Sequence, residues 1–207
     1  MKEKEGFIVL ITVIMAFIFW YFSFVLEWGN FWLKIAISAS MLAFISLARM
    51  SMEREKPFEL RLSQVFIGVV SAVLLYWIFV LGRWFLEEII PFTAGEIQGV
   101  YAFREGTSLG LIVFLLLIIT GPAEEIYWRG YLQKYLINRL GPWRGLLLTA
   151  IIYSSVHIWT LNVSLILASF IAGLFWGFLY HTQKNLLSPV ISHAIWGLLI
   201  FVLFPVV

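Results

Sequence analysis

The chain contains no cysteine and no aspartate, and it has few charges of either sign. Without a thiol, it cannot form disulfides, thiolate zinc sites or a cysteine nucleophile. Charged residues make up 13% of the 207 residues, whereas soluble domains carry roughly a quarter. Hydrophobic residues reach 62%. This balance predicts a membrane protein and gives no indication of a nucleic-acid-binding face.

Apolar stretches long enough to cross a hydrocarbon core of about 30 Å recur along the whole sequence. We predict seven spans, at residues 7–26, 31–50, 62–81, 109 to the glutamate pair at 124 and 125, 145–160, 163–180, and 186 to the C-terminus. The first stretch is too long for a cleavable signal and is read as a retained span. The pattern favours helices over a membrane barrel. The expected fold is therefore an all-α, polytopic transmembrane helix bundle, with residues 1–207 forming a single domain.

The positions of the basic residues predict how the chain is oriented in the membrane. With seven spans, one side receives eleven of them and the other side receives three. The eleven are Lys2, Lys4, Arg49, Arg54, Lys56, Arg61, Arg129, Lys134, Arg139, Arg144 and Lys184, and the three are Lys34, Arg83 and Arg104. Because cytoplasmic loops are rich in Lys and Arg, we expect a multi-pass cell-membrane protein with a cytoplasmic N-terminus. Residues 83–104 are expected to form an outer loop with an interfacial helix.

Glu124, Glu125 and Arg129 follow the apolar stretch that begins at Leu109. Charged side chains at membrane depth cost roughly 2.5–3.5 kcal/mol each, so such a cluster needs partners. Glu125 and Arg129 are four residues apart and share one helical face, whereas Glu124 points about 100° away. Glu125 and Arg129 are thus expected to form an ion pair, which leaves Glu124 free to take a proton from water. A solvated Glu-Glu-Arg face at a helix start remains the structural alternative, and both interpretations place the pair at the cytoplasmic end of the fourth span.

Two of the three histidines, His157 and His193, fall inside the fifth and seventh predicted spans. A single histidine there more often makes a hydrogen bond between helices, but two of them together with the glutamate pair indicate a site. Their expected depths differ, at about 18 Å and 10 Å from the span ends. His181 is expected to be solvated or to cap a helix end.

These residues resemble the motifs of the CAAX protease and bacteriocin-processing enzyme family, which includes the type II CAAX prenyl endopeptidases. Residues 124–129 match its Glu-Glu-x-x-x-Arg motif, residues 153–157 resemble Phe-x-x-x-His with Tyr153 in place of Phe, and residues 192–194 resemble the third motif. The resemblance covers roughly residues 109–197. It implies an intramembrane endopeptidase that acts on a membrane-associated and in some members lipidated peptide, with its site toward the cytoplasmic side.

The resemblance also implies a role for each residue. Glu124 would activate water, His157 would help to bind that water, and His193 would stabilise the oxyanion. Glu125 and Arg129 would support the site. Many family members carry Asn or another polar residue four positions after this histidine, where this chain has Gly197. A missing donor costs about 10²–10³ in rate, so a catalytically weak scaffold or immunity-type membrane protein is the alternative function.

The need for a metal is left open by the sequence. If a divalent metal such as zinc is present, Glu124, His157 and His193 would be its ligands. We favour a metal-free mechanism, because no His-x-x-x-His pair lies on one helix. The expected partners are membrane lipids and a membrane-associated peptide, with no nucleic acid. Gly173 and Gly177 form a small-residue face that is available either for oligomerisation or, as we favour, for packing within the chain.

Overall fold

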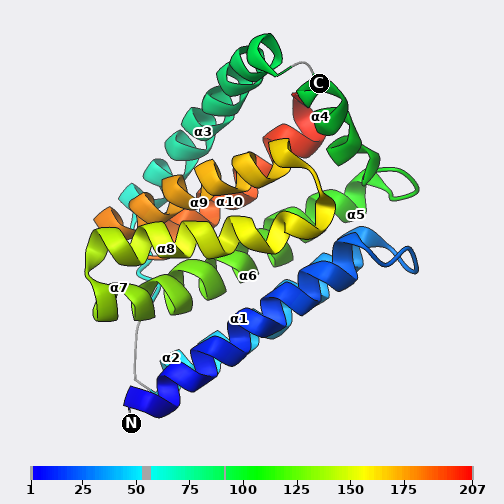
Figure 1. Cartoon of the computed structure of the whole chain (residues 1–207). Coiled ribbons are helices and arrows are strands. Elements are labelled where there is room, and N and C mark those ends of the chain that lie inside the picture. Colours follow the sequence, from blue (N-terminus) through cyan, green and yellow to red (C-terminus); the bar gives the residue numbers. More distant parts are fainter. Residues whose placement is uncertain (1, 53–56, 91, 207) are drawn as a thin grey trace.

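The computed structural model describes residues 2–52, 57–90 and 92–206, and this part of the chain contains helices and no strand (Figure 1). The helices are α1 (Lys2–Phe24), α2 (Phe31–Met52), α3 (Leu62–Ile89), α4 (Thr93–Ala102), α5 (Leu109–Phe114), α6 (Gly121–Glu125), α7 (Lys134–Leu140), α8 (Pro142–Ser155), α9 (Val163–Gln183) and α10 (Leu187–Leu198). The all-α helix bundle expected from the sequence is confirmed.

The fourth apolar segment forms one continuous helix from Leu109 to Leu140. Two π-helical segments, Leu115–Thr120 and Ile126–Gln133, join α5, α6 and α7 without a break. The expectation that the span ends at the glutamate pair is therefore wrong. Pro122 lies inside this continuous helix, because Thr120 and Gly121 before it are already helical and Gly121 N–H donates to the Leu116 carbonyl, five residues back. The glutamates consequently lie near the middle of the helix.

Five of the described helices are long and apolar enough to cross a membrane. They are α1, α2, α3, the continuous helix 109–140 and α9. Helix α8, which a 3₁₀ turn (Val156–Thr160) continues, lies between helix 109–140 and α9. A shorter apolar helix, Leu187–Leu203, follows α9 and consists of α10 and a final π-helical turn. That the chain crosses the membrane seven times stays a prediction. Residues 83–104 were expected to form an outer loop with an interfacial helix. In the structure this segment begins with the last turns of α3 and then forms α4.

Small residues allow α9 to approach its neighbours closely (Figure 1). A Cβ atom on Gly173 would lie 3.2 Å from Ala150 Cα of α8, and one on Gly177 would lie 2.9 Å from Gln133 Oε1. Both glycines are buried. The Gly173/Gly177 face therefore packs against neighbouring helices of the same chain.

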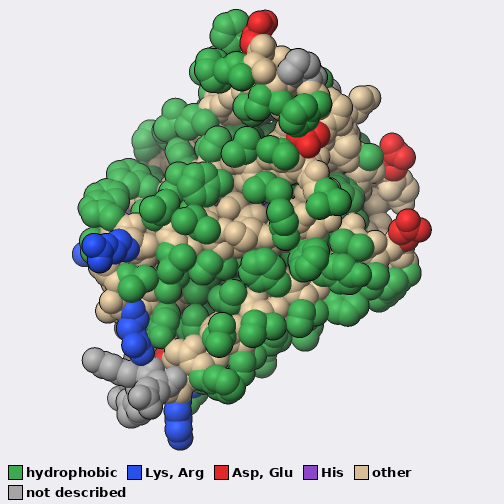
Figure 2. Space-filling model, in the orientation of Figure 1, with side chains coloured by type: hydrophobic (Ala, Val, Ile, Leu, Met, Phe, Trp, Pro, Cys, Tyr) green, Lys and Arg blue, Asp and Glu red, His purple; other side chains and the backbone are tan. Residues whose placement is uncertain are grey.

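Apolar side chains cover the visible surface, and charges gather at its two ends (Figure 2). Basic side chains lie at the end that carries the N-terminus and α7, which we call the basal end, and acidic side chains lie toward the end that carries α4, which we call the distal end. Of the eleven basic residues counted on the first side, Arg54, Lys56 and the side chain of Lys2 fall outside the described residues. Arg129 is fully buried and so does not contribute to the surface charge. Seven of the eleven basic residues remain at the basal end. They still outnumber the three basic residues on the other side, Lys34, Arg83 and Arg104.

Candidate active site

Glu125 is the centre of a buried charged cluster in the middle of the bundle. Its Oε1 atom accepts a hydrogen bond from Arg129 Nη1 at 2.8 Å and another from His193 Nδ1 at 2.8 Å. Glu125 and Arg129 are both 0% exposed. A buried carboxylate requires such partners, because leaving its charge unpaired costs several kcal/mol. The i, i+4 spacing read from the sequence thus corresponds to an ion pair, which His193 of α10 extends to a second helix.

Arg129 is enclosed by polar and aromatic groups from two other helices. Its Nη2 donates to the carbonyl of Gly173 in α9 at 3.3 Å. The guanidinium carbon lies 4.8 Å from the ring centroid of Tyr153 and 5.3 Å from that of Trp176. These contacts compensate part of the lost hydration of a buried cation. Arg129 therefore ties α8 and α9 to the helix that carries the glutamates.

Glu124 faces away from this cluster and toward a cavity. Its Oε2 atom accepts a hydrogen bond from the hydroxyl of Tyr153 at 3.1 Å, and within the described residues its other oxygen has no hydrogen-bonding partner. The side chain is 7% exposed. Tyr153, which occupies the position of the family's Phe, was not among the residues selected from the sequence. Nothing in the sequence indicated that its hydroxyl would reach a residue 29 positions earlier.

His157 lies at the start of the 3₁₀ turn that continues α8. Its Nδ1 donates to the carbonyl of Tyr153 at 2.9 Å, which leaves Nε2 as an acceptor for Trp20 Nε1 at 3.3 Å. The tautomer follows from these partners, since a carbonyl only accepts and an indole N–H only donates. Trp20 belongs to α1 and is 137 positions away in sequence. No sequence motif pointed to it, so the contribution of α1 to the site was missed.

His193 is held in place by stacking as well as by Glu125. Its ring lies parallel to that of Trp176, with centroids 3.8 Å apart and planes at 17°. Trp176 is itself fixed by a hydrogen bond from its Nε1 to Ser192 Oγ at 3.2 Å. With Nδ1 bound to Glu125, the Nε2 atom of His193 is the nitrogen left for other interactions. The imidazole is thereby fixed in both position and orientation.

A cavity of about 130 Å³ brings the three predicted catalytic residues together. Glu124, His157 and His193 all line it, so the difference in depth expected from sequence does not separate them. A water molecule needs about 10–15 Å³ on this measure, so the cavity has room for several. We call it the catalytic pocket. Its other lining residues come largely from the distal half of the bundle: Trp20, Phe24, Phe31, Trp32, Ile35, Val100, Phe103, Leu116, Thr120, Tyr153, Leu165, Ala168, Ser169, Trp196, Gly197 and Phe201.

Gly197, Asn162 and His181 have distinct places in the structure. Gly197 lines the pocket and provides no side-chain donor there. Asn162 lies outside it, where its Oδ1 caps α9 by accepting from Leu165 N–H and its amide donates to the Glu96 carbonyl. His181 is half-buried near the basal end of α9, beside the ring of Trp143.

The arrangement does not match a zinc ligand set. Both ring nitrogens of His157 already have partners, and Nδ1 of His193 is bound to Glu125. Among the described residues, no three His, Cys, Asp or Glu side chains form a group that could hold a metal ion. We therefore derive no catalytic step through a metal from Glu124, His157 and His193.

Comparison with known proteins identifies the part of the chain that holds this site. No curated protein and no solved structure matches the chain. The family model described as type II CAAX prenyl endopeptidase Rce1-like matches residues 106–199, which include Glu124, Glu125, Arg129, His157 and His193. The match covers slightly less than half of the chain. Residues 106–199 are therefore similar to the Rce1-like type II CAAX prenyl endopeptidases, a family of membrane proteases.

Proposed function

We propose that the protein is an intramembrane endopeptidase that hydrolyses a peptide bond of a membrane-associated protein, with a water molecule activated by Glu124. The observation that carries the proposal is that a nearly buried carboxylate with one unbonded oxygen lines the same cavity as two histidines. A general base must lie within hydrogen-bonding reach of the water that it deprotonates. The free oxygen of Glu124 meets that requirement for any water in the pocket next to it.

In the proposed reaction, Glu124 takes a proton from water while the water oxygen bonds to the carbonyl carbon of the substrate. The carbonyl oxygen becomes an oxyanion. Because Nδ1 of His193 donates to Glu125, Nε2 is the nitrogen that faces other partners, and a proton carried there donates to the oxyanion and stabilises it. The carbon–nitrogen bond then breaks as the leaving amine receives the proton held by Glu124. Atoms and charges balance without a further reactant.

His157 has a more limited role than the resemblance implies. Its Nε2 lone pair already accepts the Trp20 N–H bond, so it binds the catalytic water only if that water replaces or shares this contact. The bond is long, at 3.3 Å, and hence weak. We propose that His157 contributes by exchanging Trp20 for water during the reaction.

The direct test is Glu124→Gln, which keeps the shape of the side chain and removes the base. The purified protein is placed in proteoliposomes with two probes, a farnesylated CAAX peptide and a single-span apolar peptide carrying a fluorophore and quencher. We expect the wild type to cleave at least one probe and the variant to lose at least about 10²-fold in rate. Glu88→Gln, remote from the pocket, is the control. Equal cleavage by wild type and Glu124→Gln would refute the assignment.

Gly197 supports a second candidate, a scaffold or immunity-type membrane protein that keeps the cluster for packing. The pocket has no side-chain donor at that position, and oxyanion sites usually contain two. In that case neither probe is cleaved by the wild type. The Glu124→Gln variant would then change only the partner binding or the folding of the protein.

A further inference from the structure

The catalytic pocket lies toward the distal end of the bundle, away from the N-terminus. Trp20 and Phe24 belong to the last turns of α1, Phe31 and Trp32 to the first turn of α2, and Phe103 directly follows α4. All three elements meet at the end opposite the N-terminus and α7 (Figure 1). Glu124 itself lies near the middle of helix 109–140, about 20 Å from either end.

Toward the basal end the pocket is closed by packed side chains. The residues that follow the glutamates along the helix, Trp128, Arg129, Leu132 and Gln133, are each 0% exposed. Trp128 packs edge-on against both Trp20 and Tyr153, which line the pocket. The small cavity of about 70 Å³ beyond them, around Glu5 and Tyr131, shares no lining residue with the catalytic pocket.

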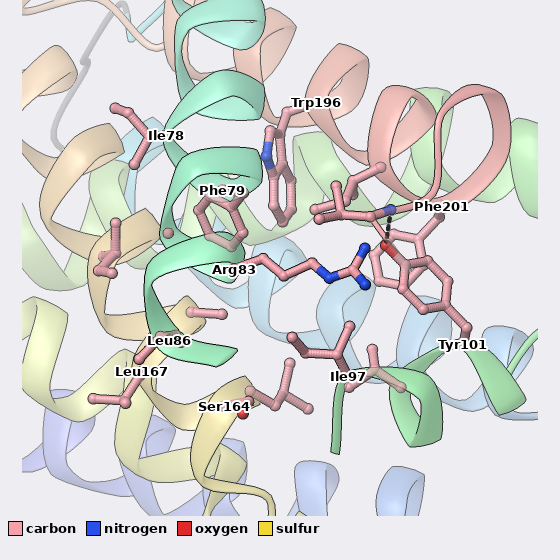
Figure 3. Close-up of a pocket in the computed structure, with 17 residues that line it drawn as sticks. Ile78, Phe79, Arg83, Leu86, Ile97, Tyr101, Ser164, Leu167, Trp196 and Phe201 are labelled. Carbon is pink, nitrogen blue, oxygen red and sulfur yellow. Dashed lines mark hydrogen bonds between the residues drawn. The ribbon is translucent and has the colours of Figure 1, made fainter. Parts of the chain in front are cut away.

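Toward the distal end the pocket adjoins further hollows. An apolar cavity of about 120 Å³ between α3, α4, α9 and α10 shares five lining residues with it: Val100, Leu165, Ala168, Trp196 and Phe201. This cavity in turn shares Arg83, Ile97 and Tyr101 with an open, polar hollow of about 840 Å³ that Gln98 and Arg104 also line. Figure 3 shows Arg83 extending from α3 toward Tyr101, at the point where the apolar cavity meets the polar hollow. Shared wall residues thus link the three hollows in sequence, from the open hollow beside α4 to the pocket that Glu124 lines.

The distal end is the non-cytoplasmic end by the distribution of surface charge. Seven basic residues with described side chains lie at the basal end, namely Lys4, Arg49, Arg61, Lys134, Arg139, Arg144 and Lys184, against three in the distal half. Since Lys and Arg accumulate on the cytoplasmic side, the basal end faces the cytoplasm. The initial expectation of a cytoplasmic-facing site assumed that the helix ends at Glu125, whereas it continues to Leu140.

We infer that the catalytic pocket is entered from the non-cytoplasmic side of the membrane, beneath α4, and that its substrates are membrane-attached peptides whose scissile bond is exposed on that side. Proteins anchored to the cytoplasmic surface would meet the closed basal end. The substrate class rests on the proposed function, but the side of entry does not. It can be measured without any hydrolysis.

The absence of cysteine makes the measurement direct, because each introduced thiol is unique in the chain. Ser169→Cys places a thiol in the pocket, Gln98→Cys one at the distal hollow, and Asn138→Cys one at the basal end. A small, membrane-impermeant methanethiosulfonate is added to spheroplasts or to inside-out vesicles. We expect positions 98 and 169 to react in spheroplasts, and position 138 only in inside-out vesicles.

Reaction of position 169 only in inside-out vesicles, or in neither preparation, would overturn the inference, as would reaction of position 98 from the cytoplasmic side. A second variant tests the route itself. Adding Ile97→Trp, which fills the junction of the two outer hollows, should slow modification at position 169 several-fold, whereas Ile118→Trp on the lipid-facing surface should not. Equal rates in these two backgrounds would refute entry beneath α4.

Discussion

Arg129 and His193 donate to the same oxygen of Glu125, each at 2.8 Å. One carboxylate thus fixes both a cation on its own helix and an imidazole on α10. The positioning of His193 and the stability of the bundle consequently depend on the same three-residue contact. The first prediction follows from this dependence.

Arg129→Gln should destabilise the protein strongly. Removing one member of a buried ion pair leaves an uncompensated charge, at a cost of about 3–5 kcal/mol. Arg144→Gln is the matched control, because Arg144 is exposed and such changes stay within about 0.5 kcal/mol. Thermal unfolding in one detergent measures both. An Arg129→Gln variant as stable as the wild type yet inactive would contradict the supporting role of Arg129 and indicate a direct one.

Tyr153→Phe should keep the fold and slow cleavage. The ring contacts with Trp128 and Arg129 remain, while the hydrogen bond that fixes the Glu124 carboxylate is lost. A base that is held less firmly is less often aligned with its water, so the rate should fall by about 10-fold or more. Tyr180→Phe, outside the pocket, should leave the rate unchanged. An unchanged rate in Tyr153→Phe would show that its hydroxyl does not position Glu124.

Gly121→Ala should impair both stability and activity. A Cβ atom there would lie 2.9 Å from the Leu116 carbonyl oxygen and 3.2 Å from the backbone of Ala194, next to His193. Overpacking of this kind costs about 1–3 kcal/mol and pushes α10 away from Glu125. Gly110→Ala is the control, since nothing lies within 4 Å of its Cβ position, and it should gain up to about 1 kcal/mol. Thermal unfolding and cleavage assays should separate the two; equal behaviour would refute close packing at Gly121.

Gly197→Asn should raise the rate of cleavage by up to about 10²-fold by adding an oxyanion donor. The new Cβ atom would lie 3.2 Å from Leu116 Cδ2, the end of a flexible side chain that can shift. Gly197→Ala adds the same Cβ without a donor and should not accelerate the reaction. Initial rates on one probe compare the two variants. A rate for Asn no higher than that for Ala would mean that the oxyanion is stabilised elsewhere.

Glu96 should stabilise the contact between α4 and α9 in a pH-dependent way. Its carboxylate accepts hydrogen bonds from Val163 N–H, Ser164 N–H and Ser164 Oγ at the start of α9. Burial alone raises the pKa of Glu96, but these hydrogen bonds outweigh it and lower the pKa below 4.5. Because the folded pKa is lowered, this stabilisation is present above pH 4.5 and is lost as the pH falls through the folded value.

Hydrogen exchange of the α4 amides from pH 7 to pH 3.5 checks this. Near neutral pH the α4 amides should exchange more slowly in the wild type than in Glu96→Gln. This difference in exchange rate should shrink below pH 4.5. Amides at the basal end of α9 serve as the internal reference. A difference that stays constant over the whole range would show that the carboxylate charge does not matter there.

The sequence predicted the helical class and the pairing of Glu125 with Arg129, because both depend on local periodicity. It did not predict Trp20 or the hydroxyl of Tyr153, since those contacts depend on tertiary packing across 137 and 29 positions. The end of the helix that begins at Leu109 was misjudged for a related reason. Charged residues normally mark the end of an apolar span, but here Arg129 and His193 compensate Glu125 inside the bundle.

The two π-helical segments that flank Gly121–Glu125 also constrain how the chain can change its length. Each wide turn holds one residue more than an ordinary α-turn. Deleting a single residue between Leu115 and Thr120 would turn the wide turn into an ordinary α-turn and keep the two halves of the helix in their present relative orientation. The same deletion in the regular turns of α5 or α7 would rotate one half by about 100° and move the carboxylates away from their partners. The wide turn should therefore tolerate the loss of one codon better than the regular turns beside it.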